Sequence, residues 1–463
     1  MTQDEAFEVL KTGANVFLTG EPGSGKTHTT NRYIAYLRGH GVEPAITAST
    51  GIAATHIDGY TVHSWSGIGV TSQVGDYELD AIAQKEKVVR RVRLAHVLVI
   101  DEISMLSQDT LGSVELVCRT LRGSDRPFGG LQVVFVGDFF QLPPVVKQQV
   151  QKNLEIEYDS PFDSAQGKPA SPFCFRSRAW ARAKPLVCYL TEQHRQEDAL
   201  FLDALSAVRR GRVTQQVKAL LQTRNIVPEG EAIYTKLFPH NANVDRLNEV
   251  ELGRLPGILK TFEMHSRGAK PLVESLKRNC LSPELLALKI GAKVMFTKND
   301  PEGAYYNGTT GEVVGFSKTN GRPLVKLRNG RTLEVDTVEW KIQDGNKILA
   351  SIEQLPLRLA WAITVHKSQG MSLDAAIVDL SQAFEYGQGY VALSRVRTLA
   401  GLYLLGFNER ALQVHPEVAA QDEVFRDSAE DTREAFGKLG VGELETMHEN
   451  FIRASGGKVA KIS

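Results

Sequence analysis

A glycine-rich segment that ends in lysine and threonine follows a short apolar run near residue 20. Residues 20–27, GEPGSGKT, fit the pattern G-x-x-x-x-G-K-[ST] at every fixed position, and residues 29–37 can form a helix after them. In such a loop the backbone N–H groups turn towards phosphates, the lysine reaches the β and γ oxygens, and the hydroxyl can ligate Mg²⁺. A chance match is the alternative, but the strand before and the helix after favour a nucleoside triphosphate site. Its predicted binding residues are Gly20, Gly23, Ser24, Gly25, Lys26 and Thr27.

Two carboxylates and a glutamine could supply the other half of an ATPase site. Asp101 and Glu102 follow the apolar run 97–100, and Gln141 comes soon after a second apolar run, 133–136. Asp101 would hold Mg²⁺, and Glu102 would orient and deprotonate the attacking water. Gln141 could sense the γ-phosphate, because ligand-contacting residues collect at the carboxyl ends of parallel strands. A lone Asp-Glu pair is commonly just solvated, but beside a complete phosphate loop it predicts hydrolysis.

The chain beyond residue 180 has the pattern of a second α/β unit without a second phosphate loop. Apolar runs at 186–190 and 375–380 predict strands, and residues 390–395 predict an amphipathic segment. Arg195 and Arg395 lie in this unit. We expect them to reach across a cleft to the nucleotide as arginine fingers, with a surface ion pair as the alternative for either one alone.

Length and composition are typical of a sizeable enzyme. At 463 residues the chain should hold two or more domains. Its 54 basic and 54 acidic residues cancel, so any nucleic-acid surface must be a local groove. There is no apolar run of membrane-spanning length, which predicts an intracellular protein, cytoplasmic or nucleoid-associated, without a membrane partner. Four scattered cysteines without C-x-x-C spacing argue against a zinc or iron–sulfur site.

Eight segments occur in the order seen in Pif-type DNA helicases of superfamily one, and their combination is far more specific than any one of them. The chain resembles this family over about residues 1–407. The stretch 102–122 is similar to the one that separates the Pif type from its RecD-like relatives. The eight segments are residues 20–27, 47–54, 61–64, 100–106, 137–144, 194–196, 366–370 and 391–395.

The resemblance implies an α/β fold in which two RecA-like P-loop domains share one ATP. It implies a motor that uses ATP and Mg²⁺, moves 5′ to 3′ on single-stranded DNA, and unwinds duplexes, forks, RNA–DNA hybrids and G-quadruplexes in genome maintenance. It further implies that Gln3 reads the adenine, with a solvated glutamine as the alternative. The residues that it implies for catalysis are Lys26, Glu102, Gln141, Arg195 and Arg395, with Thr27 and Asp101 at the metal.

The resemblance also places a DNA track across both domains. Hydroxyls, backbone N–H groups and a lysine address phosphates without reading sequence, and imidazole faces can stack on bases. Trp65 is a candidate stacker beside His63, and a core aromatic is the open alternative. The expected partners are single-stranded DNA and forked or structured DNA, bound by a monomer or by a dimer on DNA. The predicted DNA-binding residues are Thr50, Gly51, His63, Ser64, Trp65, His366 and Lys367.

The motifs and the changes of pattern between them predict the domain boundaries. Short β-like runs with Asn-Gly turns between about 290 and 340 predict a small barrel, which the family has as an SH3-like insertion. Its plausible DNA contacts are Lys293, Lys298, Tyr305 and Tyr306, with solvated charges and ordinary barrel aromatics as the alternative. The predicted parts are a first RecA-like domain at 1–184, with an accessory insertion at 66–86 near the strand-separation point and a surface loop at 147–172; a second RecA-like domain at 185–287 and 346–410; the barrel at 288–345; and an acidic helical or partly disordered extension at 411–463.

Three other functions compete with a free-standing Pif-type helicase. A RecD-like subunit of a larger recombination complex is the nearest, and the stretch 102–122 argues against it. A P-loop ATPase that remodels proteins should lack the constellation of His63, His366, Lys367 and Arg395. An ATP-gated binder of single strands would not need the Asp101-Glu102 pair.

Overall fold

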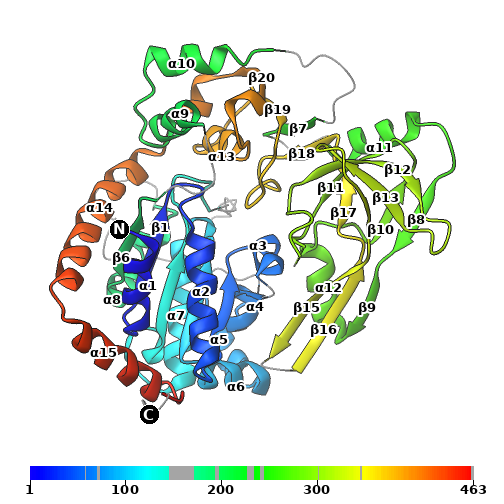
Figure 1. Ribbon diagram of the computed structural model, residues 1–463. Coiled ribbons are helices and arrows are strands. Elements are labelled where there is room, and N and C mark those ends of the chain that lie inside the picture. Colours follow the sequence, from blue (N-terminus) through cyan, green and yellow to red (C-terminus); the bar gives the residue numbers. More distant parts are fainter. Residues whose placement is uncertain are drawn as a thin grey trace, which may run out of the picture.

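The computed structural model describes residues 1–57, 59–69, 73–144, 171–192, 198–226, 234–239, 244–300, 302–344 and 347–459. Within these ranges the chain forms two parallel α/β units and a β-rich unit (Figure 1). Two further helices, α14 (Pro416–Gly437) and α15 (Val441–Ala454), run along the outer side of the first unit (Figure 1). None of the helices in these ranges combines the length and the apolar character needed to cross a bilayer.

Six parallel strands form the sheet that carries the glycine-rich loop. Their order across the sheet is β3 (Tyr60–Thr61), β2 (Ala45–Ala48), β4 (Val97–Asp101), β5 (Gln132–Val136), β1 (Val16–Gly20) and β6 (Leu186–Leu190). Successive residues alternate between two hydrophobic clusters: Phe17 and Phe135 belong to one, and Val16 and Val134 to the other. Because both faces of the sheet are covered, its central strands are apolar throughout, as the sequence runs predicted.

Helices cover both faces of this sheet. The first face carries α1 (Gln3–Lys11) and α2 (Lys26–Gly39), and the second carries α7 (Gln108–Arg122) and α8 (Arg178–Ala183). Helix α1 begins with a capping box, in which the side chains of Thr2 and Glu5 satisfy each other's backbone N–H groups. Shorter helices on this unit are α3 (Gly51–His56), α4 (Val62–Ser66), α5 (Asp76–Ala83) and α6 (Glu86–Leu94). The predicted insertion at 66–86 therefore contains α5, whereas residues 145–170, most of the predicted surface loop, lie outside the described residues.

Strand β6 belongs to the first sheet and not to the second domain, so the boundary predicted at residue 185 is wrong. Five of its residues pair in parallel with β1, from Leu186 opposite Val16 to Leu190 opposite Gly20. The chain leaves the first unit only after β6, because the apolar residues of this strand complete the edge of the sheet.

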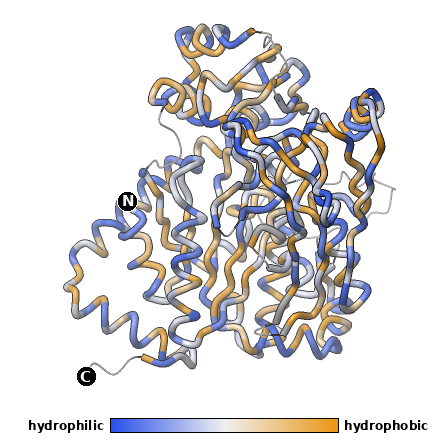
Figure 2. Tube along the Cα trace, turned by 45° about the vertical axis from the view of Figure 1, so that its right-hand side comes forward, coloured by the Kyte–Doolittle hydropathy of each residue, from blue (hydrophilic) through white to orange (hydrophobic). Residues whose placement is uncertain are grey.

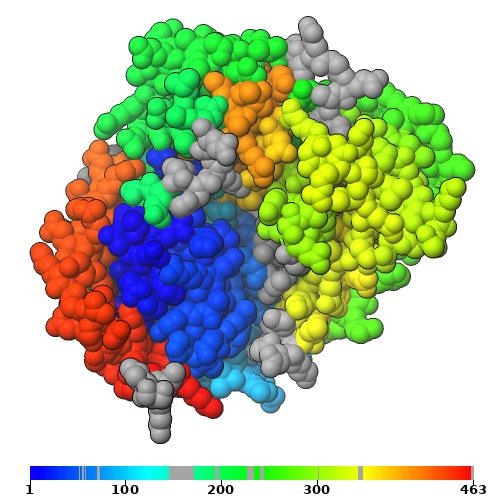
Figure 3. Space-filling model, viewed as in Figure 1, coloured from blue at the N-terminus to red at the C-terminus, as the bar shows by residue number. Residues whose placement is uncertain are grey.

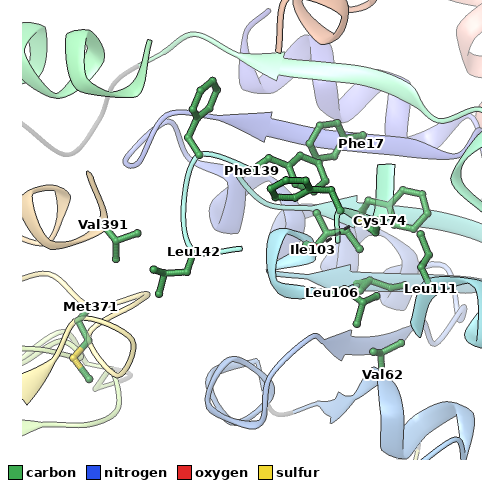
Figure 4. Packing of buried hydrophobic residues seen from close by; sticks show 14 of the residues in the cluster. Phe17, Val62, Ile103, Leu106, Leu111, Phe139, Leu142, Cys174, Met371 and Val391 are labelled. Carbon is green, nitrogen blue, oxygen red and sulfur yellow. Dashed lines mark hydrogen bonds between the residues drawn. The ribbon is translucent and has the colours of Figure 1, made fainter. Parts of the chain in front are cut away.

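The second unit has a four-stranded parallel sheet. Its order is β18 (Ala362–Thr364), β7 (Thr235–Phe238), β19 (Ala376–Leu380) and β20 (Leu402–Phe407). Its helices are α9 (Ala199–Arg209), α10 (Gln215–Gln222), α11 (Val244–Arg254) and α13 (Gln388–Ser394). Helix α13 is buried on every side, so the amphipathic pattern predicted at 390–395 is wrong. Figure 4 shows Leu142 of the first unit on the side that faces Met371 and Val391 of the second, and all three side chains are buried in one cluster.

The β-rich unit is built from antiparallel strands that extend beyond the predicted range 288–345. Strands from before and after this range share its hydrophobic core, so the predicted boundaries are too narrow. The assignment as an SH3-like barrel stays a prediction. The five-stranded sheet has the order β14 (Thr332–Glu334), β13 (Pro323–Leu327), β12 (Thr310–Phe316), β11 (Lys293–Phe296) and β17 (Leu357–Leu359), beside the pair β10 (Leu285–Leu288) and β8 (Lys260–Glu263). A separate ribbon of β15 (Val338–Asp344), β16 (Lys347–Gln354) and β9 (His265–Gly268) carries α12 (Lys270–Asn279).

The helices α14 and α15 are integral to the first unit. The ring of Phe425 on α14 lies 4.9 Å from that of Phe17 and 6.0 Å from those of Phe139 and Trp180, centroid to centroid. Figure 3 shows the two helices, orange to red, against the blue N-terminal surface, and Figure 2 shows hydrophobic and hydrophilic residues alternating along them. Residues 416–454 thus form the helical alternative of the predicted extension, held by aromatic packing.

Candidate active site and the cleft between two units

The glycine-rich loop lies between the carboxyl end of β1 and the amino end of α2. Gly25 caps α2 at a φ of 89°, a left-handed conformation that favours glycine, and a Cβ there would lie only 2.1 Å from Gln3 Nε2. The Lys26 ammonium donates to the carbonyls of Gly20 at 2.7 Å and Glu21 at 3.1 Å. Burial lowers the pKa of Lys26, while the charges of Asp138 and Glu102 oppose that shift. The lysine ammonium therefore lies against the carbonyls of the loop, where the motif predicts the phosphates, and carboxylates lie near enough to act on its pKa.

The Gln3 amide contacts both this loop and the first turn of α2. Its Nε2 donates to the carbonyl of Ser24 at 3.3 Å, and its Oε1 lies 2.9 Å from Nδ1 of His28. The Gln3 backbone N–H donates to Glu192 Oε2 at 2.9 Å. These contacts argue against the solvated alternative for Gln3, and its contact with adenine stays a prediction.

Asp101 and Glu102 lie at the carboxyl end of β4, and their negative charges act to raise the pKa of Lys26. Glu102 has a φ of 50°, a conformation that costs a non-glycine residue energy and that is found preferentially at functional sites. Its N–H donates to Asp101 Oδ1 at 2.8 Å. Burial, followed by the neighbouring carboxylate, raises the pKa of Asp101 to about 7, and burial also raises the pKa of Glu102. Two such carboxylates beside one lysine favour a further cation.

The donor set at Asp101 and Thr27 fits Mg²⁺ with a nucleotide. Both side chains offer oxygen, which Mg²⁺ prefers, and both line one cavity. Within the described residues, histidine, cysteine, aspartate and glutamate form no group of three or more that could hold a metal on their own.

A glutamine from the second unit contacts two catalytic candidates of the first. Gln369 Nε2 donates to Glu102 Oε2 and to Gln141 Oε1, each at 3.1 Å. Gln141 itself is buried, and its N–H donates to the carbonyl of Asp138 at 3.0 Å. Sequence reasoning missed Gln369, although an amide in the segment 366–370 beside two predicted DNA contacts was a usable signal.

Arg395 lies at the end of α13, on the opposite side of the cleft from the glycine-rich loop. Its guanidinium donates to the carbonyls of Val391 at 3.0 Å and Met371 at 3.3 Å, and to Ser394 Oγ at 2.8 Å. Burial lowers the pKa of Arg395, and the negative charge of Glu102 opposes this shift. The positive charge of Arg395 in turn acts to lower the pKa of Glu102, so the two groups interact electrostatically. The alternative of a surface ion pair is wrong for Arg395, which is 2% exposed. Arg195 lies outside the described residues.

A buried ion pair that the sequence did not reveal joins the two units beside the loop. Arg209 on α9 donates to Asp138 at 2.9 and 3.3 Å, and both side chains are at most 1% exposed. Tyr390 donates to the same carboxylate at 3.1 Å. Burial alone would raise the pKa of Asp138, but the Arg209 charge holds it below its usual value. Asp422 on α14 adds a second carboxylate 3.7 Å from Arg209.

One cavity of about 590 Å³ joins the nucleotide residues to part of the predicted DNA track. Thr27, Asp101 and Glu102 line it together with Thr50, His366 and Lys367. Burial lowers the pKa of His366, which favours the neutral imidazole. The β-rich unit contributes Lys298, Asn299, Tyr306 and Asn307.

The other predicted DNA residues do not line this cavity. Trp65 is 3% exposed in the hydrophobic core, so the structure supports the core alternative and contradicts its prediction as a stacker. Gly51 abuts α12, since a Cβ there would lie 1.7 Å from the Asn279 side chain, and Ser64 lines the same narrow space. His63 is partly buried, and burial lowers its pKa. The contact of Gly51, His63 and Ser64 with DNA stays a prediction.

Comparisons with known proteins identify relatives over nearly the whole chain. Residues 2–219 match the model of PIF1-like helicases, and residues 271–316 match the 2B domain of DNA helicase Pif1. The chain is 41% identical to the ATP-dependent DNA helicase Pif1 of Psychrobacter sp. (strain PRwf-1), over 100% of this chain and 76% of that protein. It is 39% identical to the ATP-dependent DNA helicase PIF1 of Homo sapiens, over 89% of this chain, and spans 61% of the human protein's length.

Solved structures show the same arrangement. The Bacteroides sp Pif1 in complex with ADP-AlF4 superposes with a TM-score of 0.77 at 31% identity, covering 92% of this chain and 96% of that one. A Bacteroides Pif1 bound to ssDNA has a TM-score of 0.62 at 31% identity, covering 93% and 97%.

Proposed function

The chain belongs to the PIF1-like helicases, which makes it an ATP-dependent DNA helicase, and we propose that it moves 5′ to 3′ along single-stranded DNA. The observation that carries a DNA-driven ATPase is the shared cavity: residues predicted for nucleotide and residues predicted for DNA line one space between the two units. A structural change during hydrolysis in that space can therefore alter the contacts with the bound strand. The 5′-to-3′ direction rests on the resemblance to Pif-type helicases. The structure of a Bacteroides Pif1 in complex with ADP-AlF3 and ssDNA, and a structure of two coordinating Pif1 helicases that concerns unwinding at forked dsDNA, support DNA as the partner.

The proposed hydrolysis divides the work between the two units. Lys26 and the glycine-rich loop hold the phosphates, and Gln3 holds the base. Glu102 accepts a proton from the attacking water, and Gln141 contacts the γ-phosphate. Mg²⁺ held by Thr27 and Asp101 would neutralise charge on the phosphates. Arg395, together with Arg195, stabilises the charge of the transition state from the second unit.

The proposed DNA contacts follow the same division. Thr50 contributes from the first unit, and His366 and Lys367 from the second. Lys367 Nζ lies 3.9 Å from Asp245 Oδ2, an exposed pairing that a phosphate can replace. We propose a monomer as the active form, with a dimer on forked DNA, and an intracellular site of action on forks, RNA–DNA hybrids and G-quadruplexes. The family match removes the protein-remodelling alternative and favours the Pif type over a RecD-like subunit.

Unwinding assays with matched substrates test this proposal. The same duplex carrying a 5′ tail or a 3′ tail should be unwound, with ATP, only in the first case. A duplex with a 5′ tail and an added quadruplex tests the finer assignment. Equal unwinding from both tails would contradict the direction, and ATP hydrolysis without any unwinding would contradict the motor.

A further inference from the structure

The turn that follows β18 carries side chains of two proposed roles, and His366, Lys367 and Gln369 all line the same cavity. His366 and Lys367 line the cavity where the DNA strand is proposed to lie. Gln369, three residues after His366, turns into the first unit and is 8% exposed. One short segment of the second unit therefore holds both a proposed DNA surface and the amide that contacts Glu102 and Gln141.

Hydrogen bonds make this turn rigid. The N–H groups of Lys367 and Ser368 donate to Oγ1 of Thr364 at 3.2 Å and to its carbonyl at 3.0 Å. The Ser368 hydroxyl donates to the carbonyl of Val365 at 2.8 Å. The Gln369 N–H donates to the carbonyl of His366 at 3.3 Å. Because the turn is tied together in this way, a displacement of His366 or Lys367 is passed on to Gln369.

The Gln369 amide holds two groups in one arrangement. A single nitrogen donates to the carboxylate of Glu102 and to the amide oxygen of Gln141, so it fixes their side chains relative to each other. The hydrogen bond from Gln369 uses Oε2 of Glu102, and Oε1 is proposed to accept the proton. The Gln369 Oε1 is buried and has no hydrogen-bond partner among the described residues. A buried unpaired amide oxygen beside a catalytic carboxylate is costly unless a further group in the cleft donates to it.

We propose that Gln369 is a positioning residue that aligns Glu102 and Gln141 for hydrolysis when the second unit is docked, and so couples the strand on His366 and Lys367 to the chemical step. This inference rests on the proposed function. The coupling between the DNA contacts and Glu102 would run through one hydrogen-bonded turn, residues 364–369. Without nucleic acid, the same contact should support a lower rate, since the turn is then held only by its own hydrogen bonds.

The central test is Gln369→Met, which keeps the size of the side chain and removes both hydrogen bonds. Turnover stimulated by single-stranded DNA should fall about 10- to 100-fold, the effect expected for lost hydrogen bonds to a charged catalytic group. The KM for ATP and the Kd for a fluorescent poly-dT oligonucleotide should each stay within about twofold, because Gln369 is assigned to neither ligand. Gln388→Met is the matched control: Gln388 is also buried, and within the described residues its Oε1 accepts from the N–H groups of Phe384 and Glu385, both in its own unit. This control should keep its stimulated rate.

A double-mutant cycle with Glu102 separates positioning from a general loss of structure. If Gln369 acts through Glu102, then Gln369→Met should not further slow single-turnover hydrolysis in the Glu102→Gln protein. Independent, multiplying losses would overturn the proposal, as would an unchanged stimulated rate in Gln369→Met alone. A rise in KM equal to the fall in kcat would assign Gln369 to nucleotide binding instead. If the wild-type ATPase ignores DNA, the proposed function fails, while the cycle still decides whether Gln369 positions Glu102.

Discussion

At the scale of single residues, the Asp101-Glu102 pair combines strain with burial. Burial raises the pKa of both carboxylates, and Glu102 keeps a left-handed backbone in spite of its side chain. Neither feature favours stability, so both are expected where a site is built for chemistry. The strand run and its two terminal acids were predictable from sequence. The strained backbone leaves no sequence pattern, and the contact with Gln369 joins residues that lie 267 positions apart, so neither could be predicted.

Replacing Glu102 by Gln should separate nucleotide binding from hydrolysis. Glu102→Gln removes only the proton-accepting carboxylate, so turnover should fall by a factor on the order of 10² to 10⁴ while ATP still binds. Lys26→Ala, which removes the phosphate contact, should abolish hydrolysis as well. Fluorescent-nucleotide titration and steady-state ATPase assays measure the two effects. Normal turnover in Glu102→Gln would contradict the assigned role of the carboxylate.

Arg395 should matter for turnover far more than for binding. Arg395→Ala removes a charge that acts from the opposite unit on the transition state, and Arg395→Lys should restore only part of the rate, because lysine offers a point charge in place of a planar fork. The kcat and the nucleotide Kd are measured side by side, with the unfolding temperature as the control for the buried contacts to Val391 and Met371. Equal losses of binding and turnover would indicate a purely structural arginine.

His448 should make the first unit less stable in mild acid. Its Nε2 lies 3.0 Å from the carbonyl of Glu8, and burial, with Lys11, lowers its pKa. The folded state therefore holds the neutral ring, and the unfolded chain gains a proton as the pH falls through about 6.5, which favours unfolding. His448→Gln should show a smaller drop in unfolding temperature from pH 7.5 to 5.5 than the wild type. A larger drop in the variant would reverse the sign of the effect.

At the scale of elements, sequence patterns located most segments but not their neighbours. The apolar runs at β1, β4, β5, β6 and β19 were recognised correctly. The partner of β6 was not, because parallel pairing joins distant segments and leaves no local pattern. Trp65 is a similar case: its place between a helix and the core depends on α6 and α7, which the residues next to it do not specify. The packing of α14 against the first sheet was likewise not predictable, because its sequence is acidic and its few aromatic residues do not indicate a partner.

The aromatic contacts of α14 should stabilise the first unit. Phe425→Ala leaves a cavity among Phe17, Phe139 and Trp180 and should lower the free energy of unfolding by about 3–5 kcal/mol. Its neighbour Val424 is 57% exposed, so Val424→Ala is the control and should change stability by at most about 0.5 kcal/mol. Chemical denaturation followed by circular dichroism measures both. Similar values for the two variants would show that α14 is only loosely attached.

At the scale of the whole molecule, ATP hydrolysis should depend on DNA, because the nucleotide lies between units that one strand can bridge. Single-stranded DNA of any sequence should raise the ATPase rate, and its affinity should fall as salt rises, since phosphates supply the contacts. His366→Ala combined with Lys367→Ala should weaken the stimulation and leave the basal rate nearly unchanged. Lys438→Ala, which removes a charge from a side chain that is 78% exposed, is the control. A parallel loss of basal and stimulated rates would assign the pair to the fold.

The first unit is finished by residues that are synthesised after the entire second unit. Its core needs residues up to 190 and then Phe425 and Ile452, which the ribosome adds more than 200 residues later. A nascent chain of only the first 200 residues therefore exposes the aromatic surface that α14 covers. N-terminal domains usually fold before the next domain is synthesised, but here the N-terminal unit lacks part of its core at that stage. The core of the first unit is therefore completed only after the second unit has been synthesised.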